Sequence, residues 1–318
     1  MKKSNLSVVI PAYNEENAIC NVLDEALNYT DEIIVVDDGS TDSTFEVALN
    51  YIKKHKEENI RQNKIIKLIR HKKNLGKVAA LNAGVKHSTR DIVIFTDADY
   101  TYPCCYFPKL AEEIEKGADL VIGSRFLPSP PKHMSFTHRF GNNLLSGMVS
   151  YISSSHITDS QSGLRAFKRE IFSRINVKAR SLEYEPKATA RAAKLGYIIK
   201  EIPIQYRKRI GKSKINPLKD PFKTIFAVVS IAYTETTLLA KAIILPSLLL
   251  ALIGIITGAA VVVEYLTLRM IVHPYSPLIT ALSLLLATQL FSLGLIIDNI
   301  TKKLTRIEEQ IRRRIVGK

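Results

Sequence analysis

The sequence predicts an α/β protein with a mostly parallel, doubly wound sheet, followed by interfacial helices and a two-helix transmembrane hairpin. Short apolar strands alternate with helical segments over roughly the first two-thirds of the chain, a pattern typical of a parallel sheet. Polar or charged residues follow these strands at their carboxyl ends. Two uncharged stretches, 242–263 and 277–297, are each long enough to cross a membrane.

The charge of the chain favours a polyanionic partner. Its 318 residues carry a net charge of +15, and the sequence pI is near 9.6. Anionic lipid, sugar-nucleotide phosphates and nucleic acid all qualify. Nucleic acid is not expected, because Trp is absent and the aromatic residues are not interleaved with basic ones. The cysteines show no metal-binding spacing and no disulfide framework, which favours a cytosolic catalytic part; they are Cys20, Cys104 and Cys105.

The first strand is expected at residues 6–10, an apolar run that Pro11 ends. Asn14 follows, and we expect it to cap a helix that reaches to about residue 29 and carries acidic residues in its first turn. This places the segment P-A-Y-N-E-E, residues 11–16, between a strand and a helix.

The second strand is expected at 32–36 and ends at D-D-G-S-T-D, residues 37–42, where Gly39 permits a tight turn. A third strand near 64–69 is followed by N-L-G-K, residues 74–77, which opens the next helix. Both strands therefore lead into polar loops of the kind that bind ligands.

The fourth strand, 92–95, reads I-V-I-F, which is typical of a strand buried on both faces. It leads directly into Asp97 and Asp99, with only Ala98 between them. In open α/β sheets, ligands bind beyond the carboxyl ends of the strands. Two neighbouring carboxylates repel each other unless a cation lies between them, so a divalent metal shared with phosphate oxygens is one interpretation. A solvated acidic turn is the alternative.

A helix near 107–116 and a strand near 118–122 follow, and the strand ends at G-S-R, residues 123–125. Acidic and basic groups thus collect at one edge of the predicted sheet: Asp37, Asp38, Lys77, Asp97, Asp99 and Arg125. A sheet needs only capping there, so this mixture favours a binding site over a row of turns. A G-x-G-x-x-G dinucleotide fingerprint after the first strand and a P-loop are both absent from the sequence.

The ordered motifs P-A-Y-N-E-E, V-V-D-D-G-S-T-D, N-L-G-K, T-D-A-D and G-S-R resemble those of family 2 glycosyltransferases of the GT-A fold. The resemblance is greatest to the dolichyl- and polyprenyl-phosphate mannose and glucose synthases. It covers roughly the first two-thirds of the chain, and the ordered set is specific although single motifs are not. The resemblance implies a nucleotide site for base and ribose lined by Pro11, Tyr13, Glu15 and Asp38.

The resemblance also implies that Asp97 and Asp99 hold Mg²⁺ or Mn²⁺ on the donor diphosphate. Lys77 and Ala98 are expected at the same donor site. Thr101 stands where the dolichyl-phosphate mannose synthases usually have Gln as a further metal-side ligand. Its hydroxyl is expected to take that place, although it reaches less far.

For the acceptor, the resemblance implies that Arg125 and Arg139 bind a lipid phosphate, and phosphate does match the fork of a guanidinium. Arg139 has an equal alternative as a solvated residue at the start of a helix expected at 138–152. Asp159 opens D-S-Q-S-G-L-R and occupies the catalytic-base position of many family 2 enzymes. A lipid phosphate is already mostly dianionic and needs no base, so Asp159 is expected to orient the donor, support the metal or hold an arginine.

Residues 201–214 form a short strand and a basic loop that resembles the family's segment closing over the donor diphosphate. The matching positions are Arg209, Ser213 and Lys214. A basic loop facing the membrane is the compatible alternative. Glu183 and Glu185 begin a helix expected to reach about residue 195. We expect these two glutamates to interact with the helix dipole or to hold an arginine.

Four segments are expected: a cytosolic GT-A catalytic domain at 1–216, amphipathic interfacial helices at 217–241, the transmembrane hairpin at 242–298 and a basic cytosolic tail at 299–318. Basic residues flank the two spans on the same side, which predicts a multi-pass membrane protein with the catalytic domain and both termini in the cytosol. The tail is expected to lie on anionic lipid or to pair with another subunit, so a homo-oligomer through the membrane helices is an option.

The resemblance implies an inverting hexosyltransferase that acts on a polyprenyl or dolichyl phosphate at the cytosolic face of the lipid bilayer. GDP-mannose is the first expected donor, and UDP-glucose the second. A transferase to a hydroxyl of a glycolipid or polysaccharide is the nearest alternative, although Q-x-x-R-W does not occur in the sequence. A non-catalytic membrane scaffold is the alternative from another class.

Overall fold

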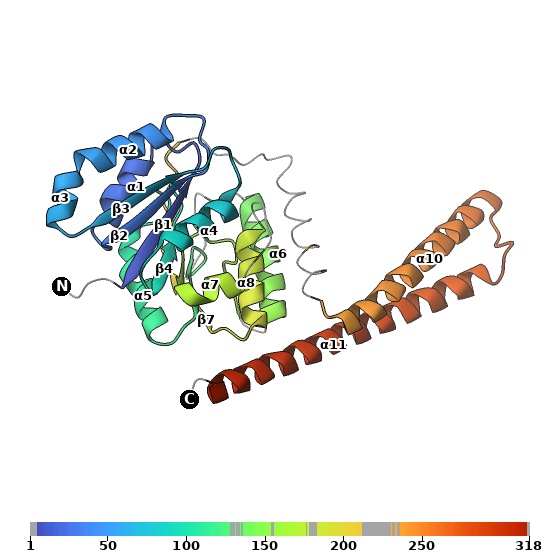
Figure 1. Cartoon of the computed structure of the whole chain (residues 1–318). Helices are drawn as coiled ribbons and strands as arrows, with labels where there is room; N and C mark the ends of the chain where they lie inside the picture. The colour runs from blue at the N-terminus through green and yellow to red at the C-terminus, as the bar shows by residue number, and fades with distance from the viewer. Residues whose placement is uncertain are drawn as a thin grey trace. The chain divides into compact units, whose positions relative to one another are not determined.

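The computed structural model describes residues 5–127, 131, 134, 136–153, 156–175, 177, 183–211, 230, 233 and 236–316. The chain divides into two compact units, Met1–Ile231 and Ala232–Lys318 (Figure 1). The first unit contains the sheet and the candidate site, and the second contains two long helices.

The first unit is built on a seven-stranded sheet with the order β3-β2-β1-β4-β6-β5-β7. The strands are β1 (Leu6–Ala12), β2 (Glu32–Asp37), β3 (Ile65–Arg70), β4 (Ile92–Phe95), β5 (Leu120–Ser124), β6 (Arg165–Lys168) and β7 (Ile199–Pro203). Within the sheet, β6 runs antiparallel to both of its neighbours, β4 and β5, and the other pairings are parallel. The predicted α/β class with a mostly parallel sheet is confirmed.

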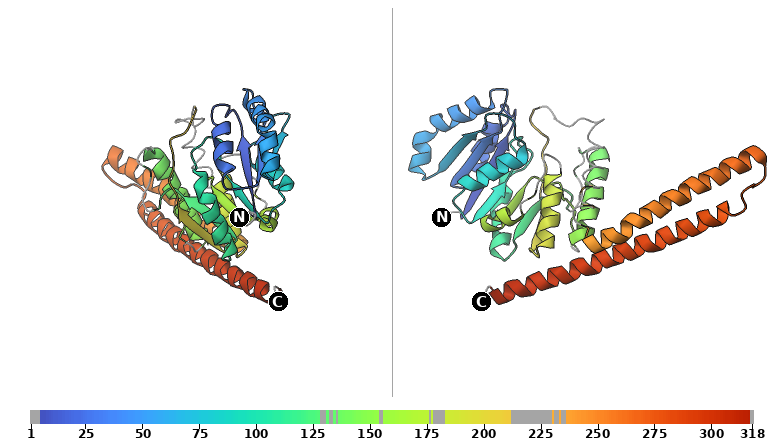
Figure 2. Two further views of the ribbon diagram at one scale, coloured as in Figure 1. Left: turned by 90° about the vertical axis from the view of Figure 1, so that its left-hand side faces the viewer. Right: turned by 45° about the vertical axis from the view of Figure 1, so that its right-hand side comes forward.

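Helices cover both faces of this sheet (Figures 1 and 2). Their bounds are α1 (Ile19–Ala26), α2 (Thr44–Lys54), α3 (Lys56–Arg61), α4 (Lys77–His87), α5 (Phe107–Glu115), α6 (Phe136–Ser153), α7 (Arg169–Ile175) and α8 (Tyr184–Lys194), with the 3₁₀ turn η1 (Cys104–Tyr106) before α5. One buried core lies under α1, α2 and α5, and a second lies under α4, α7 and α8. The central strands β1, β2 and β4 contribute side chains to both cores, as their continuous apolar sequences predict.

The predicted cap of the first helix is wrong. The helix begins at Ile19, and Ala18 is its N-cap residue. Asn14 instead adopts a left-handed conformation with φ of 54° and binds the turn after β2. Its backbone N–H donates to the Ser40 hydroxyl at 3.0 Å, and its side-chain oxygen accepts from the Thr41 backbone N–H at 2.8 Å. Asn tolerates this conformation and links the first two loops of the site edge.

The strand β6 was not predicted. This strand reads R-A-F-K and is too short and too polar to show a strand pattern. Because β6 runs antiparallel to its neighbours, it begins at the edge where β1, β2, β4 and β5 end. The residues just before it, 159–163, therefore lie at the same edge as the loops after those strands.

The second unit contains α10 (Leu238–Leu268) and α11 (Ser276–Val316), two helices long and apolar enough to cross a membrane. They pack as an antiparallel pair (Figure 2), with glycines at points of close approach. A Cβ on Gly254 would lie 2.8 Å from the Leu284 side chain, and one on Gly294 would lie 2.6 Å from that of Ile244. Such close approach is typical of helix pairs in membranes.

The helix α11 continues without a break through most of the segment predicted as the basic tail, 299–318. Most of the predicted interfacial segment, 217–241, lies outside the described residues, as does part of the loop before α6.

Candidate active site

A pocket of about 510 Å³ lies at the carboxyl ends of β1, β2 and β4. It gathers residues from segments far apart in the chain. Nine of the residues predicted for the donor and metal site line it: Pro11, Tyr13, Glu15, Asp38, Lys77, Asp97, Ala98, Asp99 and Arg209. Of the other predicted residues that the structure describes, Thr101, Arg125, Arg139 and Asp159 are not among those that line it.

The ammonium of Lys77 connects two acidic groups at this pocket. Lys77 is the first residue of α4, and its Nζ lies 2.8 Å from Asp97 Oδ1 and 2.7 Å from Glu185 Oε1. Burial opposes the positive charge, but Asp97 and Glu185 outweigh it and raise the pKa of Lys77 above its ordinary value. The cation is therefore held permanently charged beside the first aspartate of T-D-A-D.

Asp99 is held by a second set of partners. Its Oδ1 accepts a hydrogen bond from the Thr101 hydroxyl at 2.6 Å and one from the Thr101 backbone N–H at 3.2 Å. The Arg209 guanidinium lies 3.2 Å from Asp99 Oδ2 and also pairs with Glu15. Arg209 thus connects the loop after β7 with the loops after β1 and β4.

The loop that carries Arg209 is fixed to the D-A-D turn through its backbone. The Arg207 N–H donates to the Thr101 carbonyl at 2.9 Å, and the Ile210 N–H donates to the Asp99 carbonyl at 3.2 Å. Arg207 itself forms a two-pronged ion pair with Glu25 of α1 and stacks on the Tyr100 ring. The part of the basic loop that the structure describes therefore lies against the predicted metal turn. Ser213 and Lys214 lie outside the described residues.

The two aspartates titrate differently. Burial opposes ionisation of Asp97, but Lys77, and after it Arg125 and Arg209, hold its pKa below the ordinary value. For Asp99, burial and the neighbouring Asp97 charge raise the pKa, and Thr101 and Arg209 counteract this only in part. A second negative charge is therefore unfavourable in this turn until a cation is added.

This donor set fits a divalent ion bound together with phosphate. Among the described residues, no group of three or more His, Cys, Asp or Glu side chains could hold a metal. The two carboxylates Asp97 and Asp99 supply two hard oxygen ligands facing one pocket. Mg²⁺ is commonly bound in this way, by one or two carboxylates plus substrate phosphates and water.

A glycine brings the chain close to Asp97. Gly163 lies in the segment before β6, and a Cβ there would come 2.6 Å from Asp97 Oδ2. The Gly163 N–H donates to the Tyr102 hydroxyl at 2.9 Å, which fixes this approach. The glycine of the S-G-L-R motif is therefore needed for the position of the carboxylate.

Asp38 orders the loop that leads to Lys77. Its carboxylate accepts hydrogen bonds from the backbone N–H groups of Leu75 at 3.0 Å and Gly76 at 2.8 Å. It also lies 2.7 Å from His71 Nδ1. The residue predicted to line the nucleoside part of the site thus also positions the start of α4.

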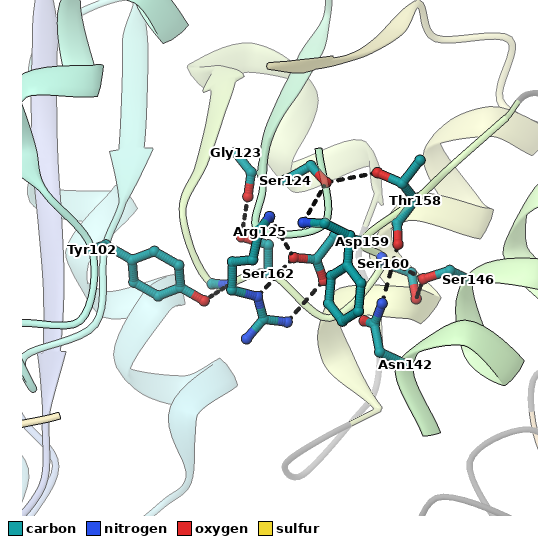
Figure 3. Close-up of polar contacts among 12 residues, drawn as sticks. Tyr102, Gly123, Ser124, Arg125, Asn142, Ser146, Thr158, Asp159, Ser160 and Ser162 are labelled. Atoms are coloured by element: carbon teal, nitrogen blue, oxygen red, sulfur yellow. Dashed lines mark hydrogen bonds and ion pairs between the residues drawn. The ribbon is translucent and has the colours of Figure 1, made fainter. Parts of the chain in front are cut away.

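Arg125 and Asp159 form a buried ion pair (Figure 3). Arg125 donates from Nε to Asp159 Oδ2 at 2.7 Å and from an Nη to Oδ1 at 2.8 Å. The Asp159 side chain is fully buried, whereas that of Arg125 is 11 % exposed. The Arg125 backbone N–H also donates to Asp159, at 3.0 Å. Of the roles considered for Asp159, this geometry matches the holding of an arginine.

The segment around Asp159 is fixed by polar contacts from β7 and α6. Glu201 of β7 accepts hydrogen bonds from the backbone N–H groups of Thr158 and Asp159 at 2.9 and 3.0 Å. Asn142 of α6 donates to the Thr158 carbonyl at 3.1 Å (Figure 3). Both elements therefore hold the backbone that carries the Asp159 carboxylate.

Arg139, the second arginine predicted for the acceptor, lies in α6 and donates to the Pro131 carbonyl at 2.7 Å. This contact ties the start of α6 to the preceding loop.

Sequence reasoning missed two residues that belong to this site, Glu185 and Gly163. Glu185 was expected to be a helix-dipole partner or arginine holder, but it binds Lys77, which lies more than a hundred positions earlier in the chain. No local pattern signals such a contact. For Gly163, the signal was present in the glycine of S-G-L-R, but its close approach to Asp97 depends on the unpredicted strand β6.

The fold and this pocket together define a glycosyltransferase of the GT-A class. The chain belongs to glycosyl transferase family 2, whose family model matches residues 7–175. It is 32 % identical over 216 residues to a dolichyl-phosphate hexose transferase of Haloferax volcanii, covering 67 % of this chain and 87 % of the relative. It is also 33 % identical over 231 residues to a dolichyl-phosphate beta-glucosyltransferase of Trichomonas vaginalis, covering 66 % of this chain and 68 % of the relative.

A solved structure shares the fold. The mannosyltransferase PcManGT of Pyrobaculum calidifontis, in complex with GDP-Man and Mn²⁺, matches with a TM-score of 0.52 and 17 % identity. The match covers 100 % of this chain and 77 % of that protein. These comparisons confirm the predicted family and the predicted enzyme class.

Proposed function

We propose that this protein transfers a hexose from a sugar nucleotide to the phosphate of a polyprenyl or dolichyl lipid, with inversion at the anomeric carbon. The acceptor class is supported by the relatives, since both are dolichyl-phosphate glycosyltransferases. GDP-mannose is our first choice of donor and UDP-glucose our second.

The donor is proposed to bind in the pocket, with its nucleoside against Pro11, Tyr13, Glu15 and Asp38. Lys77 and Arg209 supply positive charge within the same pocket, where the diphosphate would lie. Ser213 and Lys214 are proposed to extend this contact. Arg209 pairs with both Glu15 and Asp99, and a donor phosphate would either reach its remaining N–H donors or replace one of these two partners.

Asp97 and Asp99 are the residues that would hold Mg²⁺ or Mn²⁺, and Thr101 is proposed as a further contact. When bound, the ion neutralises charge that develops on the departing nucleoside diphosphate. The Thr101 hydroxyl directs Asp99 by its 2.6 Å hydrogen bond, and Lys77 directs Asp97. Charged groups fixed in this way need no rearrangement during the reaction, which is the basis of electrostatic catalysis.

The single observation that carries the choice of acceptor is the state of Asp159. Its carboxylate is fully buried, and both of its oxygens accept hydrogen bonds from Arg125. A hydroxyl acceptor requires a base to take its proton, and Asp159 is engaged elsewhere. A lipid phosphate is already ionised at neutral pH, so its oxygen can act as the nucleophile without a base. We therefore assign Asp159 the task of orienting Arg125, and Arg125 with Arg139 the binding of the acceptor phosphate.

The helices α10 and α11 are proposed to cross the bilayer, with the catalytic domain and both termini on the cytosolic side. Basic residues lie before α10 and in the second half of α11, which places these ends in the cytosol by the positive-inside rule. A long-chain lipid phosphate is available only at a membrane surface, so a membrane anchor is expected for this substrate.

The test is a panel of sugar nucleotides offered to the purified full chain with a short polyprenyl phosphate, with and without EDTA. The proposal predicts a lipid-linked sugar from one donor, no product with EDTA, and an inverted anomeric configuration by NMR. Transfer to a hydroxyl of a glycolipid but not to polyprenyl phosphate would favour the rival acceptor. A protein that binds no sugar nucleotide in the presence of metal would favour a scaffold.

A further inference from the structure

The second half of α11 carries an apolar stripe that the described residues of the second unit leave exposed. The helix α11 extends past the start of α10 (Figures 1 and 2). At the start of α10, the Thr237 backbone N–H donates a hydrogen bond to the Asp298 carboxylate of α11 at 2.8 Å. Beyond that point, the exposed fractions of the apolar side chains are 54 %, 63 %, 52 % and 52 % for Ile300, Leu304, Ile307 and Ile311.

The spacing of this stripe is that of a coiled coil. Successive members lie four, three and four residues apart, and all the residues between them are polar. Ile300 and Ile307 thus take the d positions of a heptad, and Leu304 and Ile311 take the a positions. The same spacing continues toward the membrane, with Leu286 and Leu293 at d and Leu290 and Ile297 at a. This register runs through one unbroken helix.

We propose that copies of this chain associate through α11 as a parallel coiled coil centred on Ile300–Ile311. A second copy is the occupant that the charges favour. In the heptad register, Lys303 takes a g position and Glu308 takes the following e position, and both are exposed. In a parallel coiled coil, a g residue of one helix faces the next e residue of its neighbour, so Lys303 would pair with Glu308 of another copy.

Membrane geometry supports the parallel arrangement and disfavours a membrane surface as the occupant. Copies inserted in the same sense are related by an axis along the membrane normal, so their α11 helices run parallel. At 1.5 Å per residue, α11 is about 60 Å long, roughly twice the hydrocarbon thickness. A straight helix of that length projects from the bilayer and cannot also lie flat on it. Isoleucine at the d positions favours a coiled coil of three or four helices over one of two.

Disulfide formation tests the register in native membranes. We would replace the three native cysteines with serine and introduce Ile307→Cys at a d position or, as a control, Thr305→Cys on the outer face. A parallel coiled coil predicts a disulfide-linked dimer for Ile307→Cys on mild oxidation and little for Thr305→Cys. Equal crosslinking at both sites, or none at either, would overturn the proposal.

Charge exchange separates a second copy from anionic lipid. Lys303→Glu and Glu308→Lys are each expected to weaken crosslinking and the oligomer seen by native mass spectrometry, because each places like charges opposite one another. The double exchange is expected to restore both signals. If the stripe instead binds anionic vesicles, Glu308→Lys should strengthen binding and the double exchange should rescue nothing; that result, or a monomeric wild type, would overturn the proposal. Sugar transfer is measured separately, so a failure here leaves the proposed reaction standing.

Discussion

Both carboxylate oxygens of Asp159 accept hydrogen bonds from the guanidinium of Arg125, at 2.7 and 2.8 Å, in a pair whose acid is fully buried. The residue in the usual position of a catalytic base thus fixes an arginine beside the D-A-D turn. Charge-assisted pairs of this two-pronged form are among the strongest side-chain contacts.

Asp159→Asn is expected to lower stability and to impair use of the lipid phosphate. Removing one partner of a buried ion pair costs on the order of 3–5 kcal/mol, because the other charge stays buried. Arg125 would lose its fixed orientation, so the KM for polyprenyl phosphate should rise about tenfold or more while the Kd for the donor changes little. Thermal unfolding and steady-state kinetics measure the two effects, with Glu113→Gln in a surface ion pair as the control. An unchanged acceptor KM would contradict the assigned role.

Glu185→Gln is expected to raise the metal concentration needed for donor binding. Lys77 would retain only Asp97 as an anionic partner and would compete more strongly with the metal for that carboxylate. An opposite charge at this distance changes the pKa of a carboxyl by 1–3 units, so we expect a shift of about tenfold in the half-saturating Mg²⁺ or Mn²⁺.

The matched control is Glu183→Gln, two residues earlier, which removes an ion pair with Lys187. Calorimetric titration of sugar nucleotide at several metal concentrations measures the shift. The positioning role of Glu185 fails if both variants show the same metal dependence.

Gly163→Ala is expected to displace the Asp97 carboxylate, because the new Cβ would come 2.6 Å from Oδ2. A displacement of about 1 Å in a catalytic group can reduce the rate on the order of 100-fold. Gly147→Ala is the control, since a Cβ there meets no atom within 4 Å and alanine stabilises a helix interior. Rates and metal-dependent donor binding should fall in the first variant only. Wild-type rates in Gly163→Ala would show that this close approach has no function.

The stability of the protein is expected to fall in acid partly through Glu32. Burial opposes its charge, but the Lys67 ammonium at 2.8 Å, the Ser7 hydroxyl and the Thr89 N–H lower its pKa to about 2. A carboxyl with a lowered folded-state pKa stabilises the fold above its unfolded pKa, and this stability is lost as the pH falls through about 4 toward 2.

Glu32→Gln should therefore show a smaller drop in Tm than the wild type between about pH 5 and pH 3, by a few degrees. The control is Glu57→Gln, whose pair with Arg61 is largely exposed. Thermal unfolding in detergent at a series of pH values measures the slopes. If the Tm of the wild type and that of Glu32→Gln fell by the same amount between about pH 5 and pH 3, this role of Glu32 would be contradicted.

Much of the pocket could be predicted from the sequence because its residues follow the ends of apolar strands. Asp38, Asp97 and Asp99 lie directly after β2 and β4, and parallel strands bring their carboxyl ends to one edge. Lys77 was found in the same way, as the first residue of the helix after β3.

The contacts that position these groups could not be predicted, because they join segments distant in the chain. Glu185 reaches Lys77 from α8, and Gly163 reaches Asp97 only because β6 inserts between β4 and β5. The end of α11 was missed for a different reason. The spans were located by the absence of charge, but Lys, Arg and Glu are good helix formers and carry the helix on to Val316.

The central claim is that Asp97 serves metal-dependent transfer to a lipid phosphate. It is tested most directly by comparing wild type with Asp97→Ala for sugar transfer to a short polyprenyl phosphate in the presence of Mg²⁺ or Mn²⁺. Near-UV circular dichroism serves as the check that the variant folds. The account predicts product with the wild type and none with a folded Asp97→Ala. Full transfer by that variant would contradict it.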